Sequence, residues 1–277
     1  MNDSGAADIF GQDRVYPEES FLFVCHLWGY HDLASRLAPG SLILDLACGE
    51  GYGAQALSDA GHTVVALDLE AGVVADASTR YTGPSFVAGD ALRLPFADRS
   101  FDAVGALQTI EHLAEASPFL AECARVLRPD GLCYLTTPNI AQLPETASKE
   151  FNPWHLRDFT PPELAAECAA WFEEVNLYGQ MLDESLPRVQ RLLELARREW
   201  EVVDRVARVE RMVRRLPGPM RVRLRPLLLR VAGVGDWPHP DAEAARRAIE
   251  PSDFHAEDAA DRSGCTIAVC GRPRAGA

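Results

Sequence analysis

The chain of 277 residues lacks several features that define whole classes of protein. No apolar run approaches the ~20 residues that a membrane-spanning helix needs, so stable insertion into a membrane is not expected. Residues 1–11 are polar and acidic and contain no signal-peptide core, which makes the cytoplasm the expected location. Lysine occurs only at Lys149 and the net charge is −14, which argues against nucleic acid as a partner.

Cysteine is present, but without the spacing of a metal site. The seven cysteines are odd in number, and no two have the C-x-x-C spacing that zinc sites use. A chain of this length does not need disulfides to build a stable core. We therefore expect free, mostly buried thiols.

Short apolar runs alternate with helix-length segments between about residues 40 and 140. A length of 277 residues is enough for one large α/β domain, or one domain with an added lobe, and 47% hydrophobic residues is ordinary for a globular protein. The alternation predicts a parallel, doubly wound sheet with right-handed connections. The expected strands are Ser41–Leu46, Thr63–Asp68, Ser85–Asp90, Phe101–Ala106 and Leu132–Thr136, and the expected helices between them cover 53–60, 71–81 and 117–127.

The remaining segments complete a Rossmann-like fold with an insert. Helical spacing covers 21–37 and 161–170, strands are expected at 172–178 and 265–270, and amphipathic helices at 186–216 and 220–231. The prediction is a doubly wound, seven-stranded α/β sheet with a helical insert before the last strand. Its parts are an N-terminal helical cap or lid (1–38), a core (39–180), a helical Arg-rich insert (181–260), and the final strand with a tail (261–277).

A glycine-rich turn follows the first expected strand. It comes directly after Asp45 and carries glycines at positions 49, 51 and 53. Such glycines allow a sharp bend and a close approach of backbone N–H groups to a ligand. The G-x-G-x-G spacing differs from the G-x-G-x-x-G fingerprint of dinucleotide-binding domains, which argues against an NAD enzyme.

The turn resembles motif I of the class I S-adenosylmethionine (SAM)-dependent methyltransferases of methyltransferase type 11. Asp68 ends the second strand 23 residues after Asp45, Gly89-Asp90-Ala91 follows the third strand, and 106–109 and 127–131 match two later motifs in order. Ala47 stands where many members have Gly. Alanine at this position is common in a subgroup whose motif reads D-x-A-C-G-x-G.

The resemblance implies SAM as the cofactor. It implies that Asp68 holds the two ribose hydroxyls, since a carboxylate can accept two such hydrogen bonds. It places Asp90 at the adenine amino group and the segment 106–109 beside the methyl group. The cofactor-binding residues expected on this basis are Asp45, Ala47, Gly49, Gly51, Asp68, Leu69, Asp90, Ala91 and Gln108.

Two segments are candidates for the acceptor side, where a hydroxyl acceptor would benefit from a general base. Glu111 and His112 match an E-H-L motif of small-molecule methyltransferases, although His112 could instead orient a loop. No metal is expected, because Gln108 stands where a metal-binding relative would carry Glu. His155 lies in a segment (152–160) similar to one in actinobacterial methyltransferases of glycan and natural-product pathways. It is a second candidate base, or a residue that caps the next helix.

The Arg-rich insert leaves two interpretations open. Residues 211–230 contain seven Arg and no acid. They could form a solvated face, or could meet an anionic acceptor or membrane surface. The apolar stripe of the insert could also form a homodimer. Tyr16 and His26 fall where relatives close a lid over SAM, and a core or surface role remains open for both.

The expected function is that of a SAM-dependent methyltransferase acting on a small-molecule hydroxyl. A sugar or glycosylated natural product is the expected acceptor, on resemblance alone. N-methylation of an amino sugar or small amine is the alternative activity. A catalytically silent SAM-binding subunit is the alternative of another class.

Overall fold

The computed structural model describes residues 21–142, 154–191, 251–258 and 265–274, with 194, 212, 220, 224, 260, 261 and 263. The expected amphipathic helices over 186–216 and 220–231 lie mostly outside these residues, as does Tyr16. The interpretations of the Arg-rich segment therefore stay predictions.

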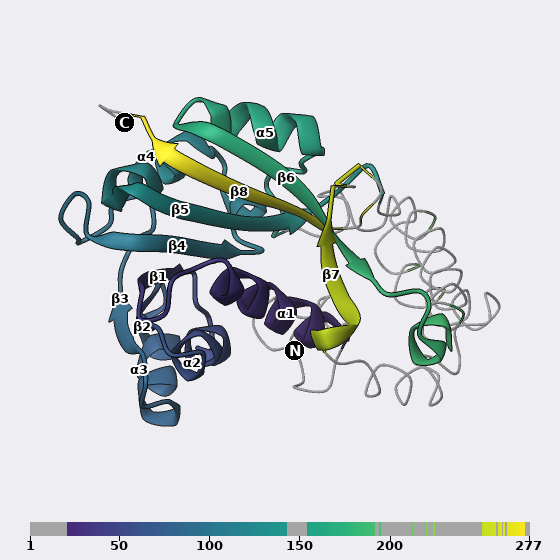
Figure 1. The fold of residues 1–277 in the computed structure, drawn as a ribbon, viewed down its shortest axis with the longest axis horizontal. Helices are drawn as coiled ribbons and strands as arrows, with labels where there is room; N and C mark the ends of the chain where they lie inside the picture. The colour runs from purple at the N-terminus through teal and green to yellow at the C-terminus, as the bar shows by residue number, and fades with distance from the viewer. Residues whose placement is uncertain are drawn as a thin grey trace.

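The described residues form one eight-stranded sheet in the order β3-β2-β1-β4-β5-β8-β6-β7 (Figure 1). β1 to β5 are parallel, and β8 is antiparallel to both of its neighbours, β5 and β6. β7 adds an antiparallel edge to β6. The strands are β1 (Leu42–Leu46), β2 (Thr63–Asp68), β3 (Ser85–Ala88), β4 (Phe101–Leu107), β5 (Leu127–Pro138), β6 (Phe172–Leu182), β7 (Phe254–Glu257) and β8 (Cys265–Pro273).

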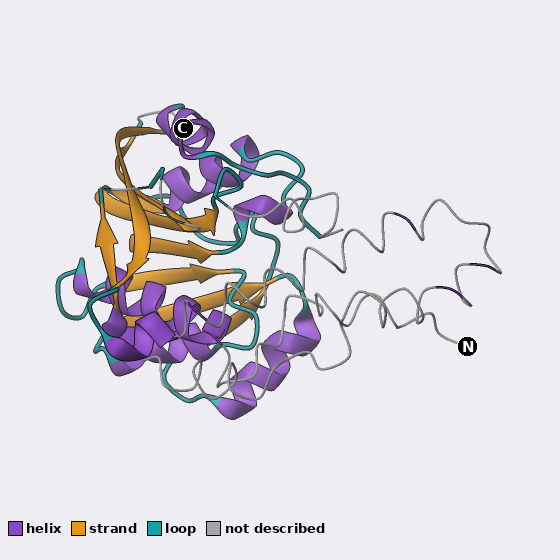
Figure 2. Ribbon diagram, turned by 90° about the vertical axis from the view of Figure 1, so that its right-hand side faces the viewer, coloured by secondary structure: helices purple, strands orange, loops and turns teal. Residues whose placement is uncertain are grey.

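Helices cover both faces of the sheet (Figure 2). Alternate residues of each strand point to opposite faces. Ile43 and Tyr134 pack on the side of α1 and α2, whereas Leu44 and Leu135 pack on the side of α4 and α5. The helices are α1 (Phe21–Ser35), α2 (Tyr52–Asp59), α3 (Ala71–Arg80), α4 (Ser117–Val126) and α5 (Pro161–Ala169), with the 3-10 turns η1 (Ile110–His112) and η3 (Pro251–Asp253).

The doubly wound α/β prediction is confirmed, but the strand count of seven is wrong. The eighth strand, β7, has four residues and lies within the range expected to be helical. It forms because β6 continues past Tyr178 to Leu182, and this extension pairs with β7. A strand this short, paired at one edge, carries too little apolar alternation to stand out in the sequence.

The strand order fixes where the functional edge of the sheet lies. From β1 the chain moves outward through β2 to β3, and then returns to β4 on the other side of β1. Connections therefore leave β1 and β4 in opposite directions. In open parallel sheets, ligands bind beyond the carboxyl ends of the strands at such a switch point.

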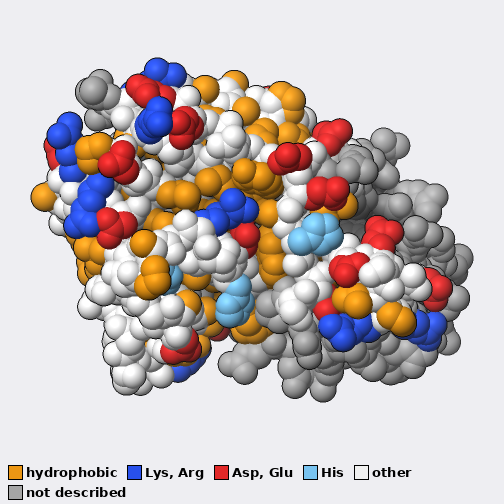
Figure 3. Space-filling model, viewed as in Figure 1, with side chains coloured by type: hydrophobic (Ala, Val, Ile, Leu, Met, Phe, Trp, Pro, Cys, Tyr) orange, Lys and Arg blue, Asp and Glu red, His pale blue; other side chains and the backbone are white. Residues whose placement is uncertain are grey.

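The described part of the chain has a surface of mixed charge (Figure 3) and cysteines that form no disulfides. Acidic and basic side chains are interspersed on the face shown in Figure 3. No helix there has the length and hydropathy to cross a bilayer. All seven cysteines are free, and five are buried, which confirms the expectation for the thiols.

Candidate active site

The expected cofactor residues gather at the carboxyl edge of the sheet. β1, β2 and β4 end at Leu46, Asp68 and Leu107, and their parallel pairing brings these ends side by side. Ala47 and Gln108 directly follow two of the ends. Both have a positive φ, 55° and 52°, which is uncommon for residues other than glycine and frequent at functional sites.

The glycine turn between β1 and α2 combines backbone strain with open space. Gly49 has φ 51°, and a Cβ added to it would meet no described residue within 4 Å. Gly51, at the N-terminus of α2, has φ 84°, and its Cβ would lie 2.7 Å from the ring of Phe86. Gly51 is thus required by the fold itself, whereas no described residue fills the space beside Gly49.

Asp45 lies beneath this turn and is fully buried. Its Oδ1 accepts a hydrogen bond from the hydroxyl of Tyr30 at 3.2 Å, while Oδ2 has no partner among the described residues. Burial raises the pKa of Asp45 to about 8; the neighbouring Asp68 also raises it, and the Tyr30 hydrogen bond lowers it. A cation or hydrogen-bond donor at Oδ2 would favour the ionised form.

Helix α1 covers the glycine turn through aromatic residues. Tyr30 packs so closely on Gly53 that a Cβ there would lie 2.0 Å from the ring. His26 Nδ1 lies 3.1 Å from the hydroxyl of Tyr52, and burial lowers the pKa of His26 to about 4. Tyr30 was not identified from the sequence, since nothing in the helical spacing of 21–37 relates it to Asp45.

Asp68 joins the second strand end to the glycine turn. Its Oδ2 accepts a hydrogen bond from Gly49 N at 3.0 Å, and its Oδ1 accepts one from Glu70 N at 3.0 Å. The side chain of Leu69 beside it is 69% exposed. Asp68 therefore orients the turn, whatever ligand it also contacts.

Asp90 and Ala91 follow β3 at the same edge. Asp90 is exposed, and its Oδ1 accepts a hydrogen bond from Leu92 N at 2.8 Å, which closes a tight side-chain turn. Ala91 is partly buried against the core. Asp90 thus stands at the surface of the predicted adenine end.

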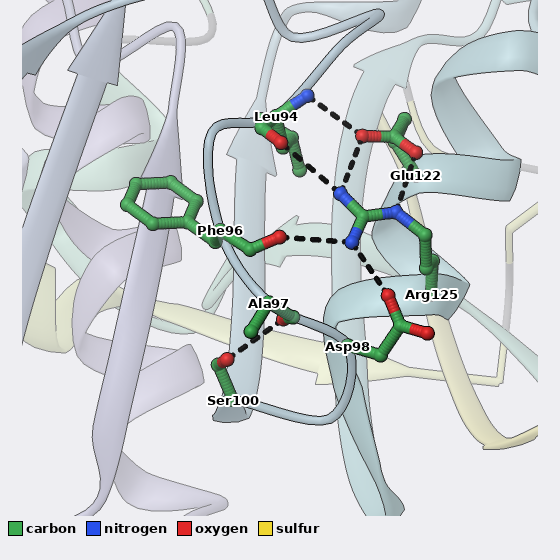
Figure 4. A network of polar contacts seen from close by, with 7 residues as sticks. All are labelled: Leu94, Phe96, Ala97, Asp98, Ser100, Glu122 and Arg125. Carbon is green, nitrogen blue, oxygen red and sulfur yellow. Dashed lines mark hydrogen bonds and ion pairs between the residues drawn. The ribbon is translucent and has the colours of Figure 1, made fainter.

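The loop that begins with Asp90 is held by Arg125 of α4 (Figure 4). The guanidinium donates hydrogen bonds to the carbonyl oxygens of Leu94 and Phe96 at 3.1 and 2.8 Å. It also pairs with Asp98 at 2.8 Å and with Glu122 at 2.7 Å. Two backbone carbonyls are satisfied by one side chain, so Arg125 fixes the loop that carries Asp90.

Gln108 is anchored away from the glycine turn. Its amide nitrogen donates to Thr136 Oγ1 at 3.2 Å and lies 3.5 Å from Cys265 Sγ. Its backbone N–H donates to the carbonyl of Thr136 at 2.9 Å. These contacts support the positive φ of Gln108 at the end of β4.

The two acceptor-side segments meet in space. The N–H groups of Leu156 and Arg157 both donate to the carbonyl of Glu111, at 2.9 and 3.1 Å. His112 Nδ1 lies 3.0 Å from the carbonyl oxygen of Trp154. The rings of His112 and His155 lie edge to face, with centroids 5.1 Å apart. Glu111, His112 and His155 are therefore brought together.

Glu111 is the buried member of this group. Its side chain is 1% exposed, and Oε2 accepts a hydrogen bond from Thr137 Oγ1 at 3.0 Å. The imidazole of His155 is partly buried. Trp154 and Leu156 on either side of it are exposed by 54% and 51%. Glu111 and His155 thus form a polar cluster that lies near the end of β5 and has exposed apolar side chains beside it.

Comparison with known proteins matches the core of this arrangement. The family described as "Methyltransferase domain" matches residues 44–135. A probable S-adenosylmethionine-dependent methyltransferase of Mycolicibacterium smegmatis is 37% identical over 155 residues, which cover 55% of this chain and 60% of that protein. A demethylmenaquinone methyltransferase of Mycobacterium marinum is 40% identical over 160 residues, covering 53% of this chain and 68% of that protein.

Solved structures agree on the fold. A SAM-dependent methyltransferase of Thermotoga maritima, described as a possible histamine N-methyltransferase, has a TM-score of 0.55 at 15% identity. The match covers 90% of this chain and 92% of the other, and shows the fold alone. The chain spans about 60% of the length of the Mycolicibacterium relative. The glycine turn and the acids at the strand ends agree with the family and sequence matches. The chain therefore belongs to the class I SAM-dependent methyltransferases, whose methyl donor is SAM.

Proposed function

We propose that the chain transfers the methyl group of SAM to a hydroxyl of a small molecule, with a sugar or glycosylated natural product as the acceptor class. The observation that carries this proposal is the meeting of Glu111, His112 and His155 beside the end of β4. A hydroxyl must lose its proton during methyl transfer, and an imidazole can accept it. A neutral amine needs less help from a base.

The residues at the strand ends fit SAM. Oδ2 of Asp45 is buried without a partner among the described residues, and none of these residues fills the space beside Gly49. SAM brings a cationic sulfonium and an ammonium group, which suit a buried carboxylate. In this proposal the residues that hold SAM are Asp45, Ala47, Gly49, Gly51, Asp68, Leu69, Asp90, Ala91 and Gln108.

The chain contributes mainly positioning. SAM, when bound, supplies the electrophilic methyl group, and the reaction needs the acceptor oxygen aligned with it. Tyr30 and Asp68 fix Asp45 and the glycine turn through their hydrogen bonds. Gln108, held by Thr136, borders the reacting region.

The proton of the acceptor would pass to His112 or His155. His112 donates its Nδ1–H to the carbonyl of Trp154, so in the neutral ring the lone pair lies on Nε2. The exposed faces of Trp154 and Leu156 offer apolar surface beside the base. A sugar ring, with one apolar face and hydroxyls around its edge, suits such a surface.

The name of the Mycobacterium marinum relative supports a second candidate, methylation of a quinone ring. The exposed apolar side chains of Trp154 and Leu156 would suit a hydrophobic ring as well. Carbon methylation of this kind forms no ether. The chemical stability and mass fragmentation of the product therefore separate the two candidates.

The test is transfer of a labelled methyl group from SAM to two acceptor panels, one of glycosides and one of demethylated quinones. A mass gain of one methyl group on a glycoside oxygen is expected. Replacing His155 by Ala should lower turnover by about 10²–10⁴-fold, with an unchanged dissociation constant for SAM. Replacing the exposed His31 by Ala is the matched control. Tight SAM binding without transfer to any acceptor would favour a silent subunit instead.

A further inference from the structure

We propose that Glu111, His112 and His155 form a binding site for a divalent transition-metal ion. One ligand atom from each residue lies within 4.8 Å of the other two. Among the residues that the structure describes, this is the one group of three such side chains so close together. Two imidazoles and a carboxylate are a ligand set that transition ions favour.

The fold holds the three ligands together through the backbone. Glu111 and His112 belong to the 3-10 turn η1, and His155 comes from a segment more than 40 residues later. The carbonyl of Glu111 accepts hydrogen bonds from Leu156 N and Arg157 N, which directly follow His155. The ligands are thus carried on two segments that are bonded to each other, in contrast to mobile surface side chains that approach by chance.

The hydrogen bonds also prepare His112 for an ion. The carbonyl oxygen of Trp154 can only accept, so Nδ1 of His112 is the protonated nitrogen. This leaves the lone pair of the neutral ring on Nε2. Histidines that bind metals usually donate their other N–H to a carbonyl or carboxylate, which fixes the orientation of the ring.

Glu111 would supply the negative charge. It is 1% exposed, and Thr137 donates a hydrogen bond to Oε2 at 3.0 Å. A buried carboxylate is costly, and an adjacent cation offsets that cost. The Thr137 hydroxyl would hold one oxygen of the carboxylate in place. Metal sites commonly contain such groups, which hydrogen-bond a ligand without binding the ion themselves.

The distances permit shared coordination after small side-chain rotations. Ions of this class bind nitrogen and oxygen at about 2.0–2.2 Å, so two ligands of one ion lie at most about 4.4 Å apart. The present limit of 4.8 Å exceeds that value by a few tenths of an ångström. The partly buried His155 can rotate to close the difference.

In the sequence, Gln108 occupies the place of a further carboxylate ligand, which predicts that no metal binds. The structure directs its amide to Thr136 and Cys265, and the third ligand comes from His155. With three protein ligands, an ion would keep positions open for an acceptor hydroxyl and would lower the pKa of that hydroxyl. The proton would then pass to solvent, and while the ion is bound neither histidine acts as the base. This role rests on the proposed function, whereas binding of the ion does not.

Metal binding by the tag-free, full-length chain tests the inference. After removal of metals with a chelator, Mn²⁺ and Co²⁺ are titrated separately by calorimetry without SAM or acceptor. We expect one ion per chain, and Co²⁺ should give a visible absorption band. His155→Ala and His112→Ala should each weaken binding by at least about 10-fold, the range seen when metal sites lose supporting groups.

Matched controls separate this site from other surface groups. His31→Ala replaces an exposed histidine of α1, and Glu115→Gln replaces an exposed acid close to Glu111 in sequence. Both should bind the ion as the unmodified chain does, whereas Glu111→Gln should not. If the buried Glu111 variant fails to fold, His155→Ala decides, provided that its SAM affinity and unfolding temperature without metal are normal.

Two results would overturn the inference. One is the absence of saturable one-to-one binding, and the other is equal affinity in His155→Ala and His31→Ala. Failure of the proposed function looks different, because the ion would bind while no acceptor gained a methyl group. Conversely, methyl transfer that persists after chelation, by a chain that binds no ion, would refute the metal site alone.

Discussion

Replacing Gly49 by Ala separates a requirement of the backbone from a requirement of the cofactor. Gly49 has φ 51°, and its added Cβ would meet no atom of the described residues within 4 Å. A left-handed backbone costs an L-residue about 1–2 kcal/mol, so the free energy of unfolding should fall by about that much. If SAM approaches this backbone, the methyl side chain of the new alanine also collides with SAM.

The size of the binding effect follows from overpacking. An extra carbon in a filled site costs about 1–3 kcal/mol, which corresponds to a dissociation constant about 5- to 150-fold higher. Calorimetric titration of SAM measures this value, and urea denaturation measures the loss of stability.

Gly61→Ala is the matched control. Gly61 has φ 92°, and its added Cβ would likewise meet none of the described residues within 4 Å. Gly61, however, precedes β2 at the opposite edge of the sheet. It should lose at least as much stability as Gly49→Ala and retain full SAM affinity. Equal SAM affinity in the two variants would show that the cofactor does not approach Gly49.

Three further changes have defined outcomes. Arg125→Met should lower the free energy of unfolding by about 2–3 kcal/mol in urea, because two loop carbonyls lose their donor. As a control, Arg80→Met, which removes the exposed arginine of a 3.6 Å ion pair with the partly exposed Glu50, should change it by less than about 0.5 kcal/mol. The pKa of His26 is near 4 in the fold, so stability should be complete above about pH 6.5 and fall by up to about 3 kcal/mol as the pH decreases to 4. A flatter pH profile is expected for His26→Gln, and an identical profile would exclude His26 as the cause. Asp68→Ala should weaken SAM binding by about 2–3 kcal/mol in calorimetry, and unchanged affinity would refute the ribose contact.

The doubly wound sheet was predictable because its signals are local. β1 and β2 are apolar runs that end on or next to an acid, and the glycine turn marks the first crossover. β5 was harder, since Arg128 to Gly131 has the composition of a turn but continues the strand from Leu127. The irregular register opposite Phe101 and Ala103 accommodates these residues, and no local pattern announces it.

The candidate site was predictable only in part, because its geometry is long-range. Residues 47–51 and Gln108 follow strand ends, and Asp68 ends β2, so their proximity follows from a parallel sheet. The contact of His155 with His112 depends on hydrogen bonds between two distant backbone segments. Tyr30 likewise reaches Asp45 from a helix that precedes the sheet.

The close packing of Tyr30 on Gly53 assigns the glycines of the turn to different causes. Gly53 leaves room for an aromatic ring of α1, whereas no described side chain lies against Gly49. A larger residue at 53 should thus be tolerated only together with a smaller one at 30, and such a pair would show strong energetic coupling. The last glycine of the motif, Gly53, is therefore required by the packing of a neighbouring helix and not by contact with a nucleotide.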